Sequence, residues 1–188
     1  MPEQLPRAKS VAVTFVEPVK DGFRFRSGGW PIHITIAPPF SIDSFSEDLI
    51  RDLEALFATT DPFGVTVEGE DAFGPKQDLP VNLVSGGSLG PLHEGLIAVL
   101  ERHGARFQNP NHIKGRYRPH VTHQQGRKAA EGERFAVEKV AFIDELPDDA
   151  GFREVKHSFP LGKIPHAGTS PETDQEAYNK TERQRGNQ

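Results

Sequence analysis

PIHITIA, at residues 31–37, is an apolar run rich in β-forming residues, and YRPHVTHQ, at residues 117–124, repeats its central pattern. Each run contains the triplet His-x-Thr with an aliphatic residue in the middle. In a β-strand, side chains i and i+2 project from the same face. Each triplet therefore presents an imidazole and a hydroxyl side by side, while the middle residue anchors the strand through its opposite face. The repetition predicts one paired site, which only tertiary structure can assemble.

Two imidazoles and two hydroxyls form a metal-free set of groups for acid–base chemistry on a phosphate ester. Histidine has an unperturbed pKa of about 6.5, so one ring can take a proton from water while the other gives a proton to the leaving oxygen. Hydroxyls and basic side chains can hold the phosphoryl oxygens. We therefore predict His33 and His120 as catalytic residues, and Thr35, Thr122 and Arg118 as phosphate-binding residues.

The same residues allow two plainer interpretations. Neutral imidazoles can bind a metal, but no carboxylate lies within or beside either triplet, so we expect neither a metal nor another cofactor. Both histidines of the triplets could also be half-buried structural residues of their strands. The other histidines form no ligand-spaced pair, and we interpret His93, His103, His112 and His123 as structural or exposed.

The composition of the chain limits the class of protein. The chain has 188 residues, a net charge of −5 and no cysteine. The absence of cysteine excludes disulfides, zinc–thiolate sites and cysteine nucleophiles. The acidic balance argues against non-specific coating of nucleic acid, whereas a nucleotide or an RNA end in a locally basic cleft remains a suitable partner. The sequence contains neither the apolar core of a signal peptide nor a membrane-spanning run, so we expect a cytoplasmic protein without a membrane partner. We expect a monomer, because nothing in the sequence resembles a zipper or an exposed apolar strip.

Hydrophobic periodicity predicts two amphipathic helices among short strands. The first helix is expected over residues 45–59, where Ser44-Phe45-Ser46-Glu47 has the form of a capping box. The second follows Ser88 as its N-cap and ends near Gly104, which suits a C′ position. From about residue 163 the chain is polar and without periodicity, which predicts a disordered tail over 163–188. Strands are expected at residues 10–16, 31–37, 63–73, 81–85, 117–124, 134–143 and 152–159.

The two triplets and their flanks resemble those of the 2H phosphoesterase superfamily, which is named for two H-x-T/S motifs and includes the 2′-5′ RNA ligases, or RNA 2′,3′-cyclic phosphodiesterases. The flanks that fit are IAPPF after the first triplet, YRP before the second, and GGSL at residues 86–89. The resemblance extends over roughly residues 8–162. It implies an α+β, bilobal fold over residues 1–162, with two pseudo-symmetric lobes of antiparallel sheet plus helix around a central cleft.

The resemblance also implies roles for individual residues. His120 would activate water and His33 would protonate the leaving oxygen, while both threonines of the triplets would bind the phosphate. Members of the family also use aromatic residues near the cleft to hold a base, and Phe40 and Tyr117 are the candidates for this base-stacking role.

The implied activity is that of a metal-independent phosphodiesterase. Its substrate would be a 2′,3′-cyclic phosphate of RNA or of a nucleotide, or a related cyclic or 2′-5′ phosphodiester, and 2′-5′ RNA ligation would be a reverse reaction. Two alternatives remain open from the sequence. One is an enzyme of the same type that acts on cyclic di- or oligonucleotides, and the other is a nucleotide- or RNA-end-binding module without turnover.

Overall fold

The computed structural model describes residues 8–124, 126–146, 149 and 151–162 of the chain. The polar segment at 163–188 lies outside the described residues, so its expected disorder remains a prediction.

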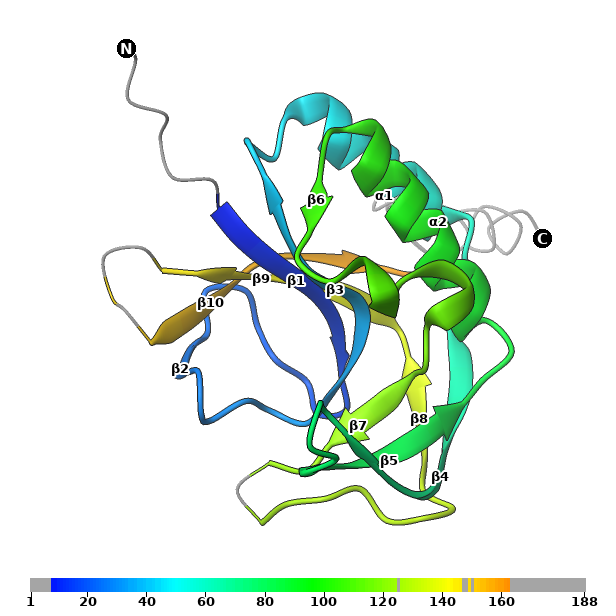
Figure 1. The fold of residues 1–188 in the computed structure, drawn as a ribbon. Helices are drawn as coiled ribbons and strands as arrows, with labels where there is room; N and C mark the ends of the chain where they lie inside the picture. The colour runs from blue at the N-terminus through cyan, green and yellow to red at the C-terminus, as the bar shows by residue number, and fades with distance from the viewer. Residues whose placement is uncertain (1–7, 125, 147–148, 150, 163–188) are drawn as a thin grey trace, which may run out of the picture.

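A single ten-stranded sheet with antiparallel pairings forms the centre of the molecule (Figure 1). The strands follow the order β2-β10-β9-β1-β3-β7-β5-β4-β8, and β6 pairs with β3 beside this path. Because β3 and β7 carry the two triplets and are neighbours in the middle of this order, the topology itself brings the triplets together. The strands are β1 (Ala8–Phe15), β2 (Arg24–Arg26), β3 (His33–Ile42), β4 (Phe63–Phe73), β5 (Leu79–Ser85), β6 (Arg106–Phe107), β7 (His120–Thr122), β8 (Arg134–Val137), β9 (Lys139–Glu145) and β10 (Phe152–Pro160).

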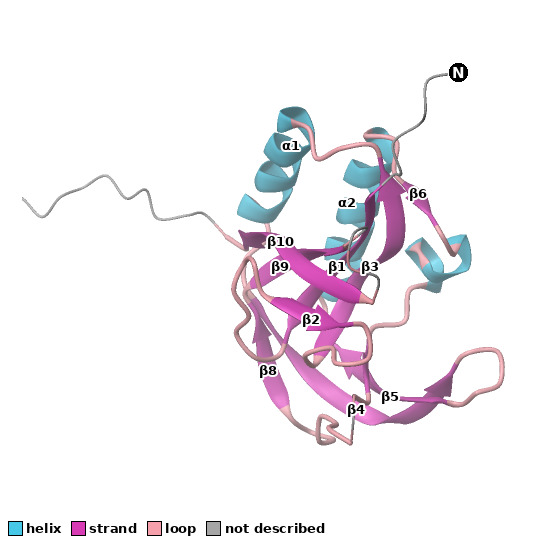
Figure 2. Ribbon diagram, turned by 90° about the vertical axis from the view of Figure 1, so that its left-hand side faces the viewer, coloured by secondary structure: helices cyan, strands magenta, loops and turns pink. Residues whose placement is uncertain are grey.

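Two helices, α1 (Glu47–Ala58) and α2 (Leu89–Arg102), pack against each other on one face of the sheet (Figure 1, Figure 2). Two short 3₁₀ helices, η1 (Pro110–His112) and η2 (Lys114–Arg116), lead towards β7. The expected α+β class, with a mostly antiparallel sheet and two helices, is therefore confirmed. No helix in the described part of the chain combines the length and the apolar character that crossing a membrane requires.

The helix ends show which local signals are correct. The N-cap of α1 is Ser46 and not Ser44, because the Ser46 Oγ accepts a hydrogen bond from the Leu49 N–H at 3.2 Å. Phe45 packs against the core before the helix begins, so the first helix starts two residues later than its expected start at residue 45. At the end of α2, Gly104 has a φ of +81°, the left-handed conformation for which glycine is suited.

The single strand expected over residues 134–143 is wrong, because the chain forms two strands there. β8 pairs with β4, whereas β9 pairs with β1 and β10. Only Glu138 separates the two strands, so the sheet must curve until its β8 edge lies next to β9. Val137 and Val140, on either side of Glu138, are both buried. The apolar pattern therefore continues from β8 into β9, and the sequence does not show where one strand ends and the next begins.

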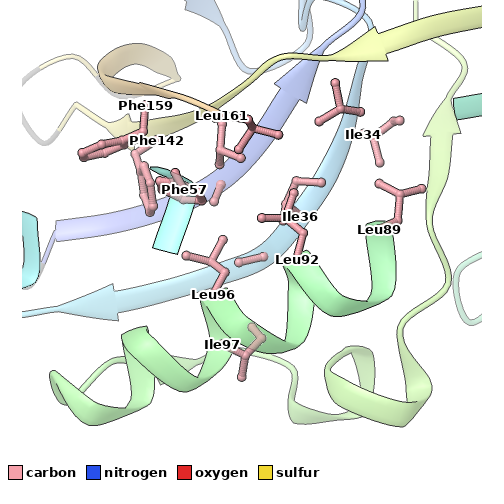
Figure 3. Close-up of a cluster of buried hydrophobic side chains, with 14 of the residues drawn as sticks. Ile34, Ile36, Phe57, Leu89, Leu92, Leu96, Ile97, Phe142, Phe159 and Leu161 are labelled. Carbon is pink, nitrogen blue, oxygen red and sulfur yellow. The ribbon is translucent and has the colours of Figure 1, made fainter. Parts of the chain in front are cut away.

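The larger hydrophobic core fills the space between the helices and the sheet (Figure 3). It includes Ile34, Ile36, Leu92, Leu96 and Phe142, all at most 2 % exposed. A smaller core lies apart from it, and its members are Val11, Val13, Phe15, Val19, Phe25, Ala141, Ile143 and Val155, with the partly buried Trp30 packed against them. β1 therefore contributes side chains to both cores, and β3 contributes to the larger one.

Candidate active site

The register of β3 and β7 brings the two triplets together. The strands pair antiparallel with Ile34 opposite Val121, and both side chains are completely buried. The same register places His33 across from Thr122 and Thr35 across from His120. Residues directly opposite in an antiparallel pair have Cβ atoms about 4.5–5.5 Å apart and share a face. The two imidazoles and two hydroxyls therefore form one four-residue cluster, and all four side chains are partly buried.

Both imidazoles are oriented by the same local hydrogen bond. The Nδ1 of His33 lies 2.8 Å from the carbonyl oxygen of Pro31, and the Nδ1 of His120 lies 2.8 Å from that of Arg118. A carbonyl oxygen only accepts, so each Nδ1 carries a hydrogen and donates it. In the neutral ring, Nε2 is then the nitrogen that can take up a proton. The two triplets thus present the same tautomer from equivalent positions.

An aromatic side chain covers each imidazole. The ring centroid of Trp30 lies 4.7 Å from that of His33, and the ring centroid of Phe73 lies 4.6 Å from that of His120. Both aromatic residues were missed by sequence reasoning. Trp30 offered a signal, because it is the only tryptophan of the chain and precedes His33 by three residues. Phe73 offered none, because its place depends on the pairing of β4 with β5 and of β5 with β7.

Burial lowers the pKa of both histidines. The pKa of His33 falls from 6.5 to about 4, mainly because burial disfavours the charged ring, and the charge of His120 adds to the effect. Burial also lowers the pKa of His120, and the positive charges of His112 and Arg118 act in the same direction. The hydrogen bonds to the backbone carbonyls oppose these effects. Both rings of the free protein are thus poised to be neutral near pH 7, and a bound anion would favour their protonated forms.

Arg118 lies at the edge of the site, beside His120. Its guanidinium lies 4.7 Å from the centroid of the Phe73 ring, and its Nη2 donates to the Asp71 Oδ2 at 2.6 Å. Arg118 and the backbone N–H of Ala72 both hold the pKa of Asp71 below its usual value, with the Ala72 bond the larger cause. A phosphate that binds Arg118 would compete with this carboxylate. The phosphate-binding role of Arg118 stays a prediction.

The expectation that Phe40 lines the cleft is wrong. Phe40 is completely buried in the larger core, where its ring lies 5.8 Å from that of Phe107 and 6.4 Å from that of Phe142. The strand expected to end at residue 37 continues through Phe40 to Ile42, and Phe40 belongs to the same core as Ile34. A base cannot reach it.

Tyr117 is engaged inside the protein. Its ring stacks on His93 with centroids 4.0 Å apart and an interplanar angle of 4°. Its hydroxyl donates to the carbonyl oxygen of Thr35 at 2.9 Å, and burial raises its pKa. One face of the ring and the hydroxyl are therefore occupied, which leaves little of Tyr117 for a base.

The remaining histidines agree with their structural or exposed interpretation. His93 is 1 % exposed and bonded to the backbone, and His103 Nε2 lies 2.8 Å from Asp52 Oδ2. His123 Nε2 lies 2.7 Å from the side-chain oxygen of Asn82, and His112 is exposed. Among the described residues, no three His, Cys, Asp or Glu side chains are grouped so as to hold a metal ion.

A pocket of about 480 Å³ borders the His33 side of the site. Trp30 and Pro31 form its wall next to His33, and Phe23 is an exposed aromatic residue on its rim. Lys20 and Arg127 give it cationic groups, but Glu17 also lines it and pairs with Arg127 at 2.7 Å. The geometry therefore places, beside the acid–base site, a pocket lined by an aromatic ring and by side chains of both charges.

Comparisons with known proteins give the family and the fold. The sequence model described as the 2′-5′ RNA ligase superfamily matches residues 8–153. No curated protein matches the chain.

Three solved structures share the fold. TT0787 of Thermus thermophilus is 19 % identical, with a TM-score of 0.50 over 83 % of this chain and 100 % of that one. A structure described as a phosphoesterase, without a named organism, is 14 % identical, with a TM-score of 0.52 over 84 % and 99 %. E. coli LigT complexed with NADP+ is 12 % identical, with a TM-score of 0.50 over 83 % and 98 %.

Proposed function

The chain belongs to the 2′-5′ RNA ligase superfamily of phosphoesterases and ligases, and from this premise we propose that it hydrolyses a 2′,3′-cyclic phosphate at an RNA end or on a nucleotide. The observation that carries the proposal is the register of β3 and β7, which sets His33 beside Thr122 and Thr35 beside His120. Each imidazole is fixed with Nε2 as its proton-accepting nitrogen. Two such rings on either side of a phosphate are suited to general base and general acid catalysis without a metal.

In the proposed reaction, the oxygen of a water molecule attacks phosphorus while the bond from phosphorus to one ribose oxygen breaks. His120 takes the proton of the water on Nε2, and the protonated His33 gives its Nε2 proton to the leaving ribose oxygen. The hydroxyls of Thr35 and Thr122 donate hydrogen bonds to the non-bridging phosphoryl oxygens. The low pKa of His33 is compatible with its role as an acid, because the phosphodiester anion stabilises the protonated ring once it binds.

The proposed place of the nucleoside is the pocket beside Trp30. Its aromatic wall suits stacking of a base, and Lys20 suits the anionic backbone of a short oligonucleotide, whereas Arg127 would have to leave its ion pair with Glu17 to bind it. The net charge of −5 favours a small substrate over a long RNA, because an extended backbone requires many cationic contacts. E. coli LigT, which shares the fold, was crystallised with NADP+, a dinucleotide. This supports a nucleotide as the class of substrate.

The test is product analysis by HPLC after incubation of the protein in EDTA with the four 2′,3′-cyclic nucleotides and with a short RNA that ends in a cyclic phosphate. We expect ring opening by the wild type, loss of it in a His33→Ala/His120→Ala double variant, and normal activity in the control His103→Gln. Equal hydrolysis by the wild type and the double variant would overturn the proposal. Saturable binding without product would favour the nucleotide-binding alternative, and the identity of the monophosphate product would show which ribose oxygen leaves.

A further inference from the structure

One edge of β3 lacks a strand partner just after the first triplet. On the edge of β3 that faces β7, Ile34 pairs with Val121 of β7. The next paired residue on this edge is Phe40, which pairs with Phe107 of β6. Within the described residues, no strand pairs with the part of this edge that lies between them. The backbone around Thr35 therefore needs other partners, since buried carbonyl groups are costly to leave unpaired.

The other edge of β3 is irregular at the same point. The register with β1 shifts by one residue between the Ala12–Ala37 pair and the Val13–Thr35 pair, so Ile36 has no residue opposite it on β1. Such bulges bend a strand and re-aim its side chains, and they are frequent beside active sites. The conformation of Thr35 is therefore not set by a regular ladder alone.

A buried histidine binds the bulged residue. His93 of α2 is 1 % exposed, and its Nδ1 lies 2.6 Å from the carbonyl oxygen of Ile36. Its Nε2 accepts a hydrogen bond from the backbone N–H of Lys114 at 2.8 Å. Because Nε2 accepts, Nδ1 must carry the hydrogen and donate it to Ile36. The ring is thus a neutral bridge between β3 and the segment before β7, and burial, which lowers its pKa, keeps it neutral.

Tyr117 binds the adjacent carbonyl group. Its ring lies flat on that of His93, and its hydroxyl donates to the carbonyl oxygen of Thr35 at 2.9 Å. Its own N–H donates to the carbonyl oxygen of Lys114 at 2.8 Å. Tyr117 precedes His120 by three residues, so a single side chain links the backbone of the first triplet to the approach of the second.

The segment that enters β7 is itself held in a costly conformation. Lys114 has a φ of +57°, which is unfavourable for a residue with a Cβ atom. The hydrogen bond from its N–H to His93 and the ion pair of its Nζ with Glu101 hold this conformation in place. Both partners belong to α2, so the helix fixes the path of the chain towards His120.

We propose that His93 and Tyr117 form a positioning unit that sets the distance and orientation of the two His-x-Thr triplets. The unit binds the carbonyl groups of Thr35 and Ile36 on one side and the backbone of Lys114 on the other. Neither residue is a catalytic residue, because each acts through the backbone of a triplet. The proposal rests on the proposed function for its effect on rate, and on the geometry alone for its effect on the positions of His33 and His120.

Tyr117→Phe and His93→Phe test the hydrogen bonds of the positioning unit separately from its ring stacking. Tyr117→Phe keeps the stacked ring and removes only the hydroxyl, whereas His93→Phe keeps a ring for stacking and removes both hydrogen bonds. His103→Phe is the matched control, since it removes a histidine that caps the same helix and bonds to Asp52 of α1. His93→Asn retains a donor for the Ile36 carbonyl and should recover part of the lost rate.

The kinetic readout is kcat and KM per folded molecule, with the folded fraction measured by circular dichroism. We expect kcat to fall about tenfold in Tyr117→Phe and more in His93→Phe, with a smaller change in KM, because small displacements of reacting groups reduce rates strongly. His103→Phe should stay within about twofold of the wild type even if its melting temperature falls. A wild-type kcat in folded Tyr117→Phe and His93→Phe would overturn the proposal.

The second readout does not depend on turnover. Long-range ¹H–¹⁵N spectra of the imidazole rings should show displaced resonances of both His33 and His120 in Tyr117→Phe, and unchanged ones in His103→Phe. Unchanged ring resonances in Tyr117→Phe would overturn the positioning unit. If the wild type turns over no substrate, the proposed function fails and the ring spectra still decide the positioning unit.

Discussion

Ile34 of β3 lies directly across from Val121 of β7, and neither side chain has any exposed surface. These are the middle residues of the two triplets, and both belong to the larger core under the helices. The histidine and threonine side chains emerge from the opposite face of the same two strands. The positions of the acid–base groups are therefore fixed by apolar packing directly behind them.

Truncation of Ile34 should lower the stability of the protein. Ile34→Ala is expected to reduce the free energy of unfolding by about 2–5 kcal/mol, and Ile34→Val by about 0.5–1.5 kcal/mol, because the cavity scales with the atoms removed. Urea unfolding measures both. The exposed Leu79 supplies the control, and Leu79→Ala should change the free energy by less than about 0.5 kcal/mol. A cost of Ile34→Ala as small as that of Leu79→Ala would contradict the packing described here.

Removal of either hydroxyl should slow hydrolysis without unfolding the protein. Thr35→Val and Thr122→Val keep the shape of the side chain and remove a donor to the phosphate. We expect each to reduce kcat by about 10²-fold, in the range measured when one donor to a developing oxyanion is lost. Thr66 of β4 pairs with Ser85 and Arg134 and with neither triplet, so Thr66→Val is the control. Steady-state kinetics with a 2′,3′-cyclic nucleotide gives the answer, and rates close to the wild type for both variants would exclude phosphate binding by these hydroxyls.

The rate should have an acidic optimum in kcat/KM. Catalysis by two histidines requires one protonated and one neutral ring, and the free protein has a His33 pKa of about 4 and a His120 pKa below 6.5. The bell of kcat/KM should therefore have its acidic limb near the His33 pKa of about 4 and its basic limb at the lowered pKa of His120. Because the bound phosphodiester favours protonated rings, the bell for kcat should lie at higher pH. Rates measured from about pH 3.5 to 9 at constant ionic strength check both curves, and a kcat/KM optimum above about pH 7.5 would contradict the lowered pKa values.

His33 should make stability depend on pH. Its folded pKa of about 4 lies below the unfolded value of 6.5, so between these values the unfolded chain binds more protons. The contribution is fully present above pH 6.5 and is lost as the pH falls towards 4. It amounts to at most about 3 kcal/mol, and solvent screening of this partly buried ring makes it smaller. In urea unfolding at about pH 7 and pH 4, His33→Gln should lose less stability on acidification than the wild type does, and equal losses would contradict the shift.

Trp30 should lower the pKa of His33, and Phe73 should lower the pKa of His120. Trp30→Ala exposes His33 to water and should raise the pKa of that ring, because burial is the main cause of its low value. Phe73→Ala should raise the pKa of His120 instead. Titration of the ring resonances by NMR distinguishes the two. Trp30→Ala should also raise KM for a cyclic nucleotide if the base lies beside Trp30, and an unchanged KM would place the base elsewhere.

The elements with strong local signals could be predicted from the sequence. The alternation in the two triplets predicts which side chains share a face, and helical spacing predicts α1 and α2. Local signals fail where the outcome depends on pairing between distant segments. The break at Glu138 interrupts no apolar pattern, and the tertiary contacts on its two sides decide that β8 and β9 take different partners.

The same limit applies to the site. His33, Thr35 and their counterparts follow from the motifs, but the roles of Phe73 and His93 follow from the sheet order and from the packing of α2. His93 was interpreted from the sequence as structural or exposed, and its two backbone partners lie far from it in the sequence. The misplacement of Phe40 has the same cause, because the strand expected to end at residue 37 continues to Ile42 and buries Phe40 in the larger core.

The shortness of β7 bears on how the chain folds. This strand has three residues, and in the described part of the chain it is the strand that pairs with both β3 and β5. It therefore joins β2, β10, β9, β1 and β3 to β5, β4 and β8. Pairings between segments so distant in sequence form slowly, because the loop-closure entropy must be lost first. We expect α1, α2 and the local hairpins to form early in refolding, and the closing of β3 on β7 to come late. During refolding, catalytic activity would then return only when β3 pairs with β7. Its recovery should be slower than the recovery of the helical circular dichroism signal.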